Sequence, residues 1–132
     1  NAAINDFNNA IKINPNDSWL YMYRSNAYYK KGSILKEKIS KNKGSDNLQE
    51  LNVKMKQSNQ YALTDSDIAI DLYPKGKARG MKLEDFYLGR AYVKKSLGLY
   101  FCFDMENACE KNSSPNQSSE YDYCNVYYKE CN

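Results

Sequence analysis

The sequence predicts an all-α fold in which antiparallel helices stack one on another. Two observations predict it. Apolar residues recur at helical spacing in several separate segments, and proline, glycine and short polar runs divide these segments. The chain of 132 residues has the length of a single domain.

The first element is expected between residues 1 and 15. Ala3, Phe7, Ala10 and Ile11 fall on one helical face, and Pro15 stops the helix. These residues predict a short amphipathic helix with a defined end.

A second helix is expected to begin directly after this proline. Asn16, Asp17 and Ser18 are all good N-cap residues. The helix continues through Trp19, and Gly32 suits its end. The two helices therefore form a hairpin with a short turn.

The same pattern returns twice further along the chain. Ala62, Ser66, Ala69 and Pro74 repeat the spacing of the first helix. The run from Phe86 to Tyr92 echoes the run from Met22 to Tyr28, with Gly89 in the place of Ser25. A partner helix is expected from about Leu99 to Lys111, with Ala108 in the close-packed place. Small residues at these positions let neighbouring helices approach closely.

Helical hairpins with small residues at the crossings resemble the tetratricopeptide repeat (TPR). The resemblance covers Ala2 to Gly32 and Tyr61 to Lys111. It implies a TPR-like α-solenoid of antiparallel helix hairpins. The expected divisions are a partial repeat over 1–15, a repeat over 16–74 with an insertion at about 33–58, a third repeat over 75–112 and a capping helix over 119–132.

The insertion keeps a helical pattern. Leu35 and Ile39 continue one stripe, Leu51 and Met55 begin another, and a polar run around Gly44 lies between them. We therefore expect both helices of this repeat to be lengthened into a projecting arm. Residues 33–58 hold six lysines against three acidic residues, a net charge of +3. This charge is interpreted as a solvated face or as a docking surface for an acidic partner.

Two polar connections flank the third repeat. The basic turn 75–80 is expected to be a flexible loop, with a phosphate or sulfate site as the alternative. Residues 112–119 form a polar loop before the last helix, expected from Glu120 to Cys131.

All four cysteines lie near the C-terminus, in pairs seven residues apart: Cys102 with Cys109, and Cys124 with Cys131. Two helical turns separate the members of each pair, so they share a face. Antiparallel folding about the polar loop then sets Cys109 against Cys124 and Cys102 against Cys131. Two disulfides are the favoured interpretation, and a four-thiolate metal site or free buried thiols are the alternatives. Disulfides predict an oxidising, extracytoplasmic location: periplasmic, cell-surface or secreted.

The amino-acid composition limits the classes of function that the chain can have. The chain has no histidine, which removes the commonest general base and every Ser-His or Cys-His pair. An enzyme would have to use carboxylates, lysine or tyrosine. The candidate carboxylates are Asp65, Asp67 and Asp71, which we interpret as a solvated face and turn caps. A net charge of +3 does not favour nucleic acid as partner, and no apolar run is long enough to span a membrane. We expect no catalytic residue, cofactor or metal.

The resemblance implies a binding face on the concave side, formed by the first helix of each pair. The residues at matching spacing are Trp19, Tyr23, Asn26, Tyr29 and Lys30 in one helix and Phe86, Tyr87, Arg90 and Lys94 in the other, with Met22, Leu83 and Val93 in the same stripes. Aromatic residues and arginine carry much of the energy of protein interfaces. We expect a non-catalytic scaffold that binds a peptide or partner protein on this face. One alternative is that the stripe packs against the arm or neighbouring repeats. Another is that the chain is one structural layer of a longer solenoid. Its exposed first helix would then dock on upstream repeats or on copies of the chain.

Overall fold

The computed structural model describes residues 1–44, 46–73, 80–110 and 123–131. These ranges contain six helices and no strand, which confirms the all-α prediction. The helices are α1 (Ala2–Ile13), α2 (Ser18–Lys41), α3 (Leu48–Leu72), α4 (Leu83–Ser96), α5 (Cys102–Glu110) and α6 (Tyr123–Cys131).

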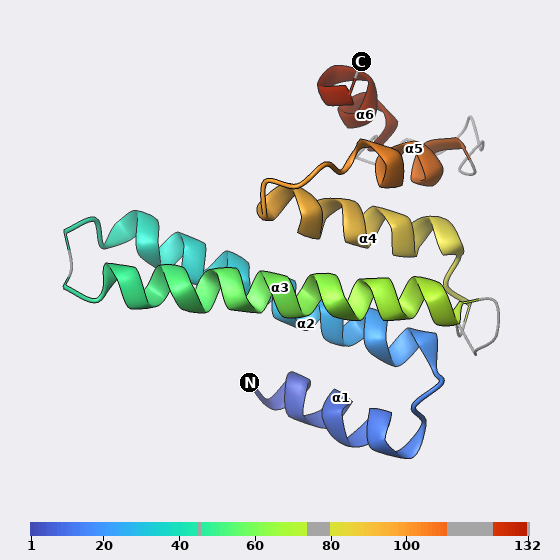
Figure 1. Ribbon diagram of the computed structural model, residues 1–132, viewed down its shortest axis with the longest axis horizontal. Helices are drawn as coiled ribbons and strands as arrows, with labels where there is room; N and C mark the ends of the chain where they lie inside the picture. The colour runs from blue at the N-terminus through green and yellow to red at the C-terminus, as the bar shows by residue number, and fades with distance from the viewer. Residues whose placement is uncertain (45, 74–79, 111–122, 132) are drawn as a thin grey trace.

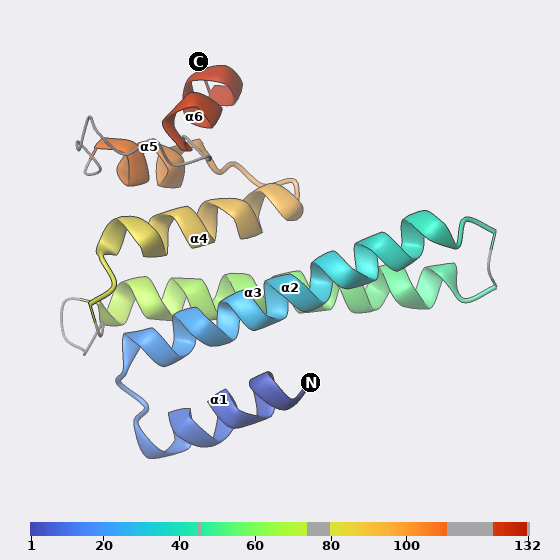
Figure 2. The same ribbon diagram turned by 180° about the vertical axis from the view of Figure 1, so that it is seen from behind.

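The helices stack in chain order. Each described helix packs against the next, and α2 also contacts α4. Figures 1 and 2 show the stack from opposite sides, with α1 at one end and α6 at the other. The long helices α2 and α3 extend beyond the stack on one side.

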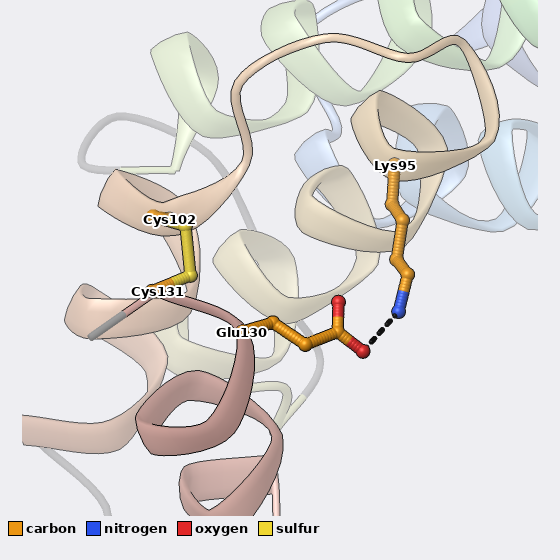
Figure 3. The surroundings of a disulfide bond; sticks show 4 residues. All are labelled: Lys95, Cys102, Glu130 and Cys131. Atoms are coloured by element: carbon orange, nitrogen blue, oxygen red, sulfur yellow. Dashed lines mark hydrogen bonds and ion pairs between the residues drawn. A yellow bond between two sulfur atoms is a disulfide. The ribbon is translucent and has the colours of Figure 1, made fainter.

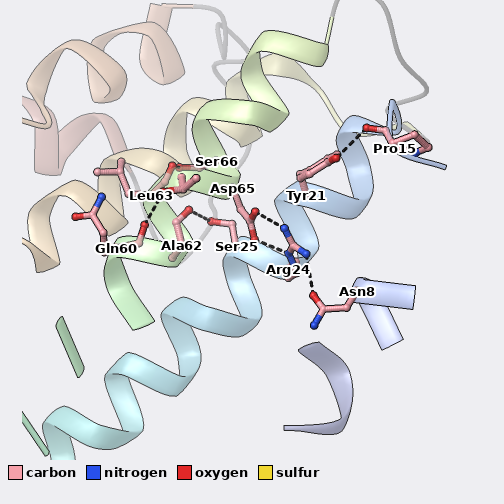
Figure 4. Close-up of polar contacts among 11 residues, drawn as sticks. Asn8, Pro15, Tyr21, Arg24, Ser25, Gln60, Ala62, Leu63, Asp65 and Ser66 are labelled. Carbon is pink, nitrogen blue, oxygen red and sulfur yellow. Dashed lines mark hydrogen bonds and ion pairs between the residues drawn. The ribbon is translucent and has the colours of Figure 1, made fainter. Parts of the chain in front are cut away.

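The turn between α1 and α2 is fixed by local hydrogen bonds. Asp17 is the N-cap of α2, and its Oδ1 accepts from the backbone N–H of Trp19 at 3.1 Å. The hydroxyl of Tyr21 donates to the carbonyl of Pro15 at 2.9 Å (Figure 4). Of the three expected capping residues, Asp17 thus takes the role.

The arm is the part of α2 and α3 that projects from the stack, residues 32–41 and 48–59. Helix α2 has 24 residues and α3 has 25. Helix α2 ends before Gly44 and α3 begins after it; the φ of Gly44 is +110°, a value that favours glycine. The prediction that the inserted residues are helical and turn near Gly44 is confirmed.

Gly32 corrects one expectation. It does not end a helix but lies buried in the middle of α2, opposite Asn59 of α3. A Cβ at this position would overlap the Asn59 side-chain amide. Close contact between two long helices, and not a helix end, explains the glycine here.

The core lies between α2, α3 and α4. Met22, Ala69 and Phe86 form its centre, and the ring of Tyr73 meets Phe86 edge-on with centroids 5.1 Å apart. Ala62, Ala91 and Ala108 are buried as well, whereas Ala10 is only half-buried. Ala10 differs because, among the described helices, only α2 packs on α1.

The connection after α4 turns at Gly98. Its φ is +70°, its N–H donates to the carbonyl of Lys95 at 3.1 Å, and the N–H of Leu99 donates to the carbonyl of Lys94 at 2.9 Å. This pair of bonds is a Schellman motif, which ends the helix. Residues after it are non-helical, so α5 begins at Cys102 and not near Leu99 as expected.

The last described helix begins at Tyr123 and ends at Cys131. The expected features at 74–79, 112–119 and 120–122 lie outside the described residues.

Both predicted cysteine pairs are brought to bonding distance. Cys102 and Cys131 have Cα atoms 5.6 Å apart, and those of Cys109 and Cys124 are 5.3 Å apart. Figure 3 shows the first disulfide and, beside it, the ion pair of Lys95 with Glu130 at 2.7 Å. The disulfides join α6 to α5 near both ends of α6, so a helix of three turns stays in place. This pairing argues against the metal-site and free-thiol interpretations.

Candidate partner-binding face

An aromatic cluster lies at the junction of α1 and α2. The rings of Trp19 and Tyr23 are 4.2 Å apart between centroids, and Phe7 of α1 lies 6.4 Å from Trp19 and 6.1 Å from Tyr23. One helical turn separates Trp19 from Tyr23, so both rings project from the same side of α2. Tyr23 remains 39% exposed. The cluster therefore presents a preformed aromatic surface to solvent.

Asn26 continues this surface along α2. Its side chain is exposed and lies next to Gly89 of α4, where a Cβ would be 3.8 Å from the Asn26 Oδ1. The same Cβ would be 3.2 Å from the sulfur of Met22, so glycine permits the close approach of α4 to α2. We call Phe7, Trp19, Tyr23 and Asn26 the aromatic face.

The other expected residues of α2 flank this face. Tyr29 is half-buried and Lys30 is exposed. In α4, Tyr87 is half-buried beneath the guanidinium of Arg90, 5.6 Å from its carbon to the ring centroid.

Phe86 is not part of an accessible face. It has no exposed surface, because it packs on Ala69 and Tyr73 of α3 in the core. Met22 and Val93, expected in the same stripes, are buried too. The expectation that these residues line a binding surface is wrong, because α4 turns this side toward the core.

Arg24 holds three helices together. Its Nε and Nη2 donate to the two carboxylate oxygens of Asp65 in α3, both at 2.7 Å. Its Nη1 donates to the Oδ1 of Asn8 in α1 at 2.8 Å. Asp65 is buried, and Figure 4 shows its carboxylate facing the guanidinium. We call this group the Arg24 clamp.

Arg90 forms a second group of the same kind. Its Nε and Nη2 donate to Asp104 of α5 at 2.9 and 2.7 Å, and its Nη1 donates to Asp67 of α3 at 3.0 Å. The ammonium of Lys94 also reaches Asp104, at 2.8 Å. Asp104 is completely buried. In this Arg90 clamp, Arg90 and Lys94, both expected on the binding face, are thus already paired within the protein.

Both guanidinium groups are held in the charged form. The hydrogen bonds that Arg24 donates to Asp65 are the main cause that raises the pKa of Arg24. Burial lowers the pKa of Arg90, but its hydrogen bonds to Asp104 and Asp67 and the charges of these two carboxylates together outweigh burial, and the net pKa is raised. A raised pKa gives a stabilisation that is complete below the ordinary arginine pKa and lost only as the pH rises above it. Both guanidinium groups therefore stay charged at neutral pH.

The two clamps occupy equivalent places in the repeated pattern. Asp65 and Asp104 each stand four residues before a buried alanine, Ala69 and Ala108. In the α2 and α4 helices, the shared signal is a tyrosine three residues before the arginine and a small buried residue after it. Arg24 lies 5.6 Å from the Tyr21 ring, the same separation as Arg90 from Tyr87.

This equivalence corrects the sequence alignment. Ser25 directly follows Arg24, and Ala91 directly follows Arg90. Ala91 therefore corresponds to Ser25 in place of the expected Gly89, so α4 is shifted by two residues from the expected register. Ser25 and Ala91 are both buried. The carboxylates of Asp65 and Asp67, interpreted from the sequence as solvated, each hold an arginine.

In the described ranges no group of three or more acidic, cysteine or histidine residues could hold a metal ion. None of the helices within these ranges is both long and apolar enough to cross a bilayer.

Comparisons with protein-family models, with curated proteins and with solved structures find no match to this chain.

Proposed function

We propose that this chain is a TPR-like, non-catalytic scaffold that binds a peptide or partner protein through the aromatic face. The observation that carries the proposal is the close pair of Trp19 and Tyr23, with Phe7 beside both rings and Tyr23 exposed to solvent. Tryptophan and tyrosine supply large contact area at low entropic cost, which is why they dominate binding energy at interfaces.

Three features of the fold support the TPR-like assignment. Successive helices pack on one another, and α2 contacts α4 across the intervening helix. Small buried residues occur at Ala62, Ala69, Ala91 and Ala108. The Arg24 and Arg90 clamps repeat at corresponding places, as expected if one structural unit occurs twice.

The clamps also change the kind of partner we expect. Because Arg90 and Lys94 already hold Asp104, they are poor partners for a ligand carboxylate. The aromatic face instead offers rings for an apolar side chain and the exposed amide of Asn26 for a peptide backbone. We therefore propose recognition by an apolar anchor and not by a terminal carboxylate.

Binding of peptides from a displayed random library tests this function. One group of the selected peptides is expected to bind the wild-type protein and to lose at least tenfold in affinity with Tyr23→Ala, which corresponds to about 1.4 kcal/mol. Tyr61→Ala is the matched control, because Tyr61 is also an exposed tyrosine but lies in α3. Equal binding by wild type and Tyr23→Ala for every selected peptide would reject the aromatic face as the site.

A structural role in a longer stack is the second candidate. Only α2 among the described helices packs on α1, and Ile13 at the end of α1 is 77% exposed. A further helix can therefore continue the stack at this end. Association measured by analytical ultracentrifugation should then depend on protein concentration and disappear in Ile13→Glu; a monomer at all concentrations argues against self-assembly through α1.

The two disulfides also lead us to propose an oxidising, extracytoplasmic location. Peptide mapping of the protein isolated from its source without reductant is expected to recover both pairs linked. Recovery of four free thiols would contradict this location.

A further inference from the structure

A second surface lies where the arm leaves the stack. The C-terminal end of α4 stands over the middle of α3, and the two helices enclose a recess of about 490 Å³. Its walls are formed by Met55, Lys56, Gln57, Gln60, Ser96 and Leu97. The aromatic face is formed by α1 and α2, so no residue is shared between the two surfaces.

The recess has an apolar floor and a polar margin. Met55 and Leu97 are half-buried, whereas Lys56 and Gln60 are exposed. The Schellman turn directly after Leu97 leads to Leu99 and Tyr100, both exposed, with Tyr100 at 75%. This combination of apolar contact area and a few polar side chains is typical of a ligand-binding cleft.

The arm, which supplies one wall of the recess, carries an excess of positive charge. On the arm, Glu37 pairs with Lys41 and Glu50 pairs with Lys54, each within its own helix. Lys36, Lys38 and Lys56 are exposed and form no ion pair with another residue in the described ranges. The excess positive charge of the arm is therefore available to an acidic partner, and Lys56 brings it to the wall of the recess.

The polar groups at the margin suit a polypeptide. Gln60 points its amide away from Arg24 (Figure 4), and a side-chain amide can donate to and accept from an extended backbone. Gln57 donates to the Tyr61 hydroxyl at 3.2 Å, and the Ser96 hydroxyl donates to the Val93 carbonyl at 2.7 Å. Gln60 and Lys56 thus remain to orient a ligand. A nucleic acid fits less well, because the described residues that line the recess include no aromatic ring for base stacking.

We propose that this recess binds an extended acidic peptide segment of a partner protein. An apolar side chain of the segment enters between Met55 and Leu97, a neighbouring carboxylate pairs with Lys56, and the Gln60 amide bonds the peptide backbone. The site is independent of the aromatic face, so one chain can hold two segments at once.

A displayed random peptide library, selected in parallel on the wild-type protein and on Lys56→Glu, tests the proposal. Peptides enriched on wild type are expected to place Asp or Glu next to a large apolar residue. Their affinity should fall at least tenfold with Lys56→Glu and severalfold with Gln60→Ala. Lys56 and Gln60 are exposed, so both variants should keep the wild-type circular dichroism spectrum.

Two controls separate this site from others. Lys12→Glu makes the same charge change at an exposed lysine of α1 and should leave these peptides bound. A general charge effect would instead lower the peptide affinity of Lys12→Glu and Lys56→Glu equally. Tyr23→Ala should also leave them bound, so the aromatic face and the recess can fail separately.

The proposal is overturned by any of three results: no enriched acidic peptide, equal binding by Lys56→Glu, or complete competition by single-stranded DNA at equal concentration.

Discussion

The Arg24 and Arg90 clamps share a geometry but differ in their surroundings. In each, an arginine donates two hydrogen bonds to a buried aspartate on the next helix and a third to the preceding helix. In the Arg24 clamp the third acceptor is the neutral Asn8, and no other cation reaches Asp65 in the described contacts. The Arg90 clamp adds Lys94 and replaces Asn8 by the charged Asp67.

This difference lies in the partners of the two carboxylates and much less in their burial. The Asp104 side chain is 0% exposed and the Asp65 side chain 4% exposed, but Asp104 is held by two cations and Asp65 by one. Removing water from a charge is expensive unless hydrogen bonds and opposite charges replace it. Asp104 has more such partners, and the two clamps should therefore respond unequally to mutation.

The largest effect is expected for Asp104→Ala. It leaves Arg90 and Lys94 without their shared buried partner, so the free energy of unfolding should fall by about 3–5 kcal/mol. Urea unfolding followed by circular dichroism measures the loss. Asp104→Asn keeps the shape and a hydrogen-bond acceptor, so it should cost less; a loss below about 1 kcal/mol for the alanine variant would contradict this view of the clamp.

A smaller loss is expected for Asp65→Ala. Only Arg24 loses its partner, and water can reach the part of the guanidinium that is exposed, so we expect about 2–3 kcal/mol. The same urea titration compares the two aspartates directly. If Asp65→Ala destabilises the protein more than Asp104→Ala, the number of cations around the carboxylate does not set the difference between the clamps.

Lys94→Met tests the extra cation of the Arg90 clamp. Arg90 still holds both oxygens of Asp104, so the loss should be about 1 kcal/mol. Lys95→Met is the matched control, because Lys95 forms an exposed ion pair with Glu130 and should matter less. Equal thermal stability of the two variants would show that Lys94 adds nothing to the clamp.

The smallest effects are expected at the third contact of each clamp. Asn8→Ala and Asp67→Ala should each cost less than about 1 kcal/mol, since Asp67 is 55% exposed and Asn8 is neutral. The two differ in salt dependence: the Asp67 contribution should shrink at high ionic strength and that of Asn8 should not. A salt-independent loss for Asp67→Ala would mean that its charge is unimportant.

Local patterns were enough for much of the fold and part of the site. Helical spacing and turn residues predicted the helices, and the seven-residue cysteine spacing predicted both pairs, because these features depend on neighbours along one helix or one hairpin. Trp19, Tyr23 and Asn26 were also placed on one side of α2 by periodicity alone, and the structure leaves them accessible to different degrees.

The environment of α4 could not be obtained in this way. Periodicity put Phe86 and Arg90 in one stripe, but it does not say which neighbouring helix covers which part of that stripe. The structure buries Phe86 against Tyr73 and turns Arg90 toward Asp104. A shift of two residues in the register of α4 was hidden for the same reason.

The sequence by itself determined that the chain is helical, where most helices lie and which cysteines pair, since backbone preference and side-chain spacing act locally. Only the tertiary structure decided the place of Gly32, the burial of Phe86 and the pairing of the buried charges. These depend on how closely helices distant in sequence approach, and that distance is set by the packing of all their side chains together.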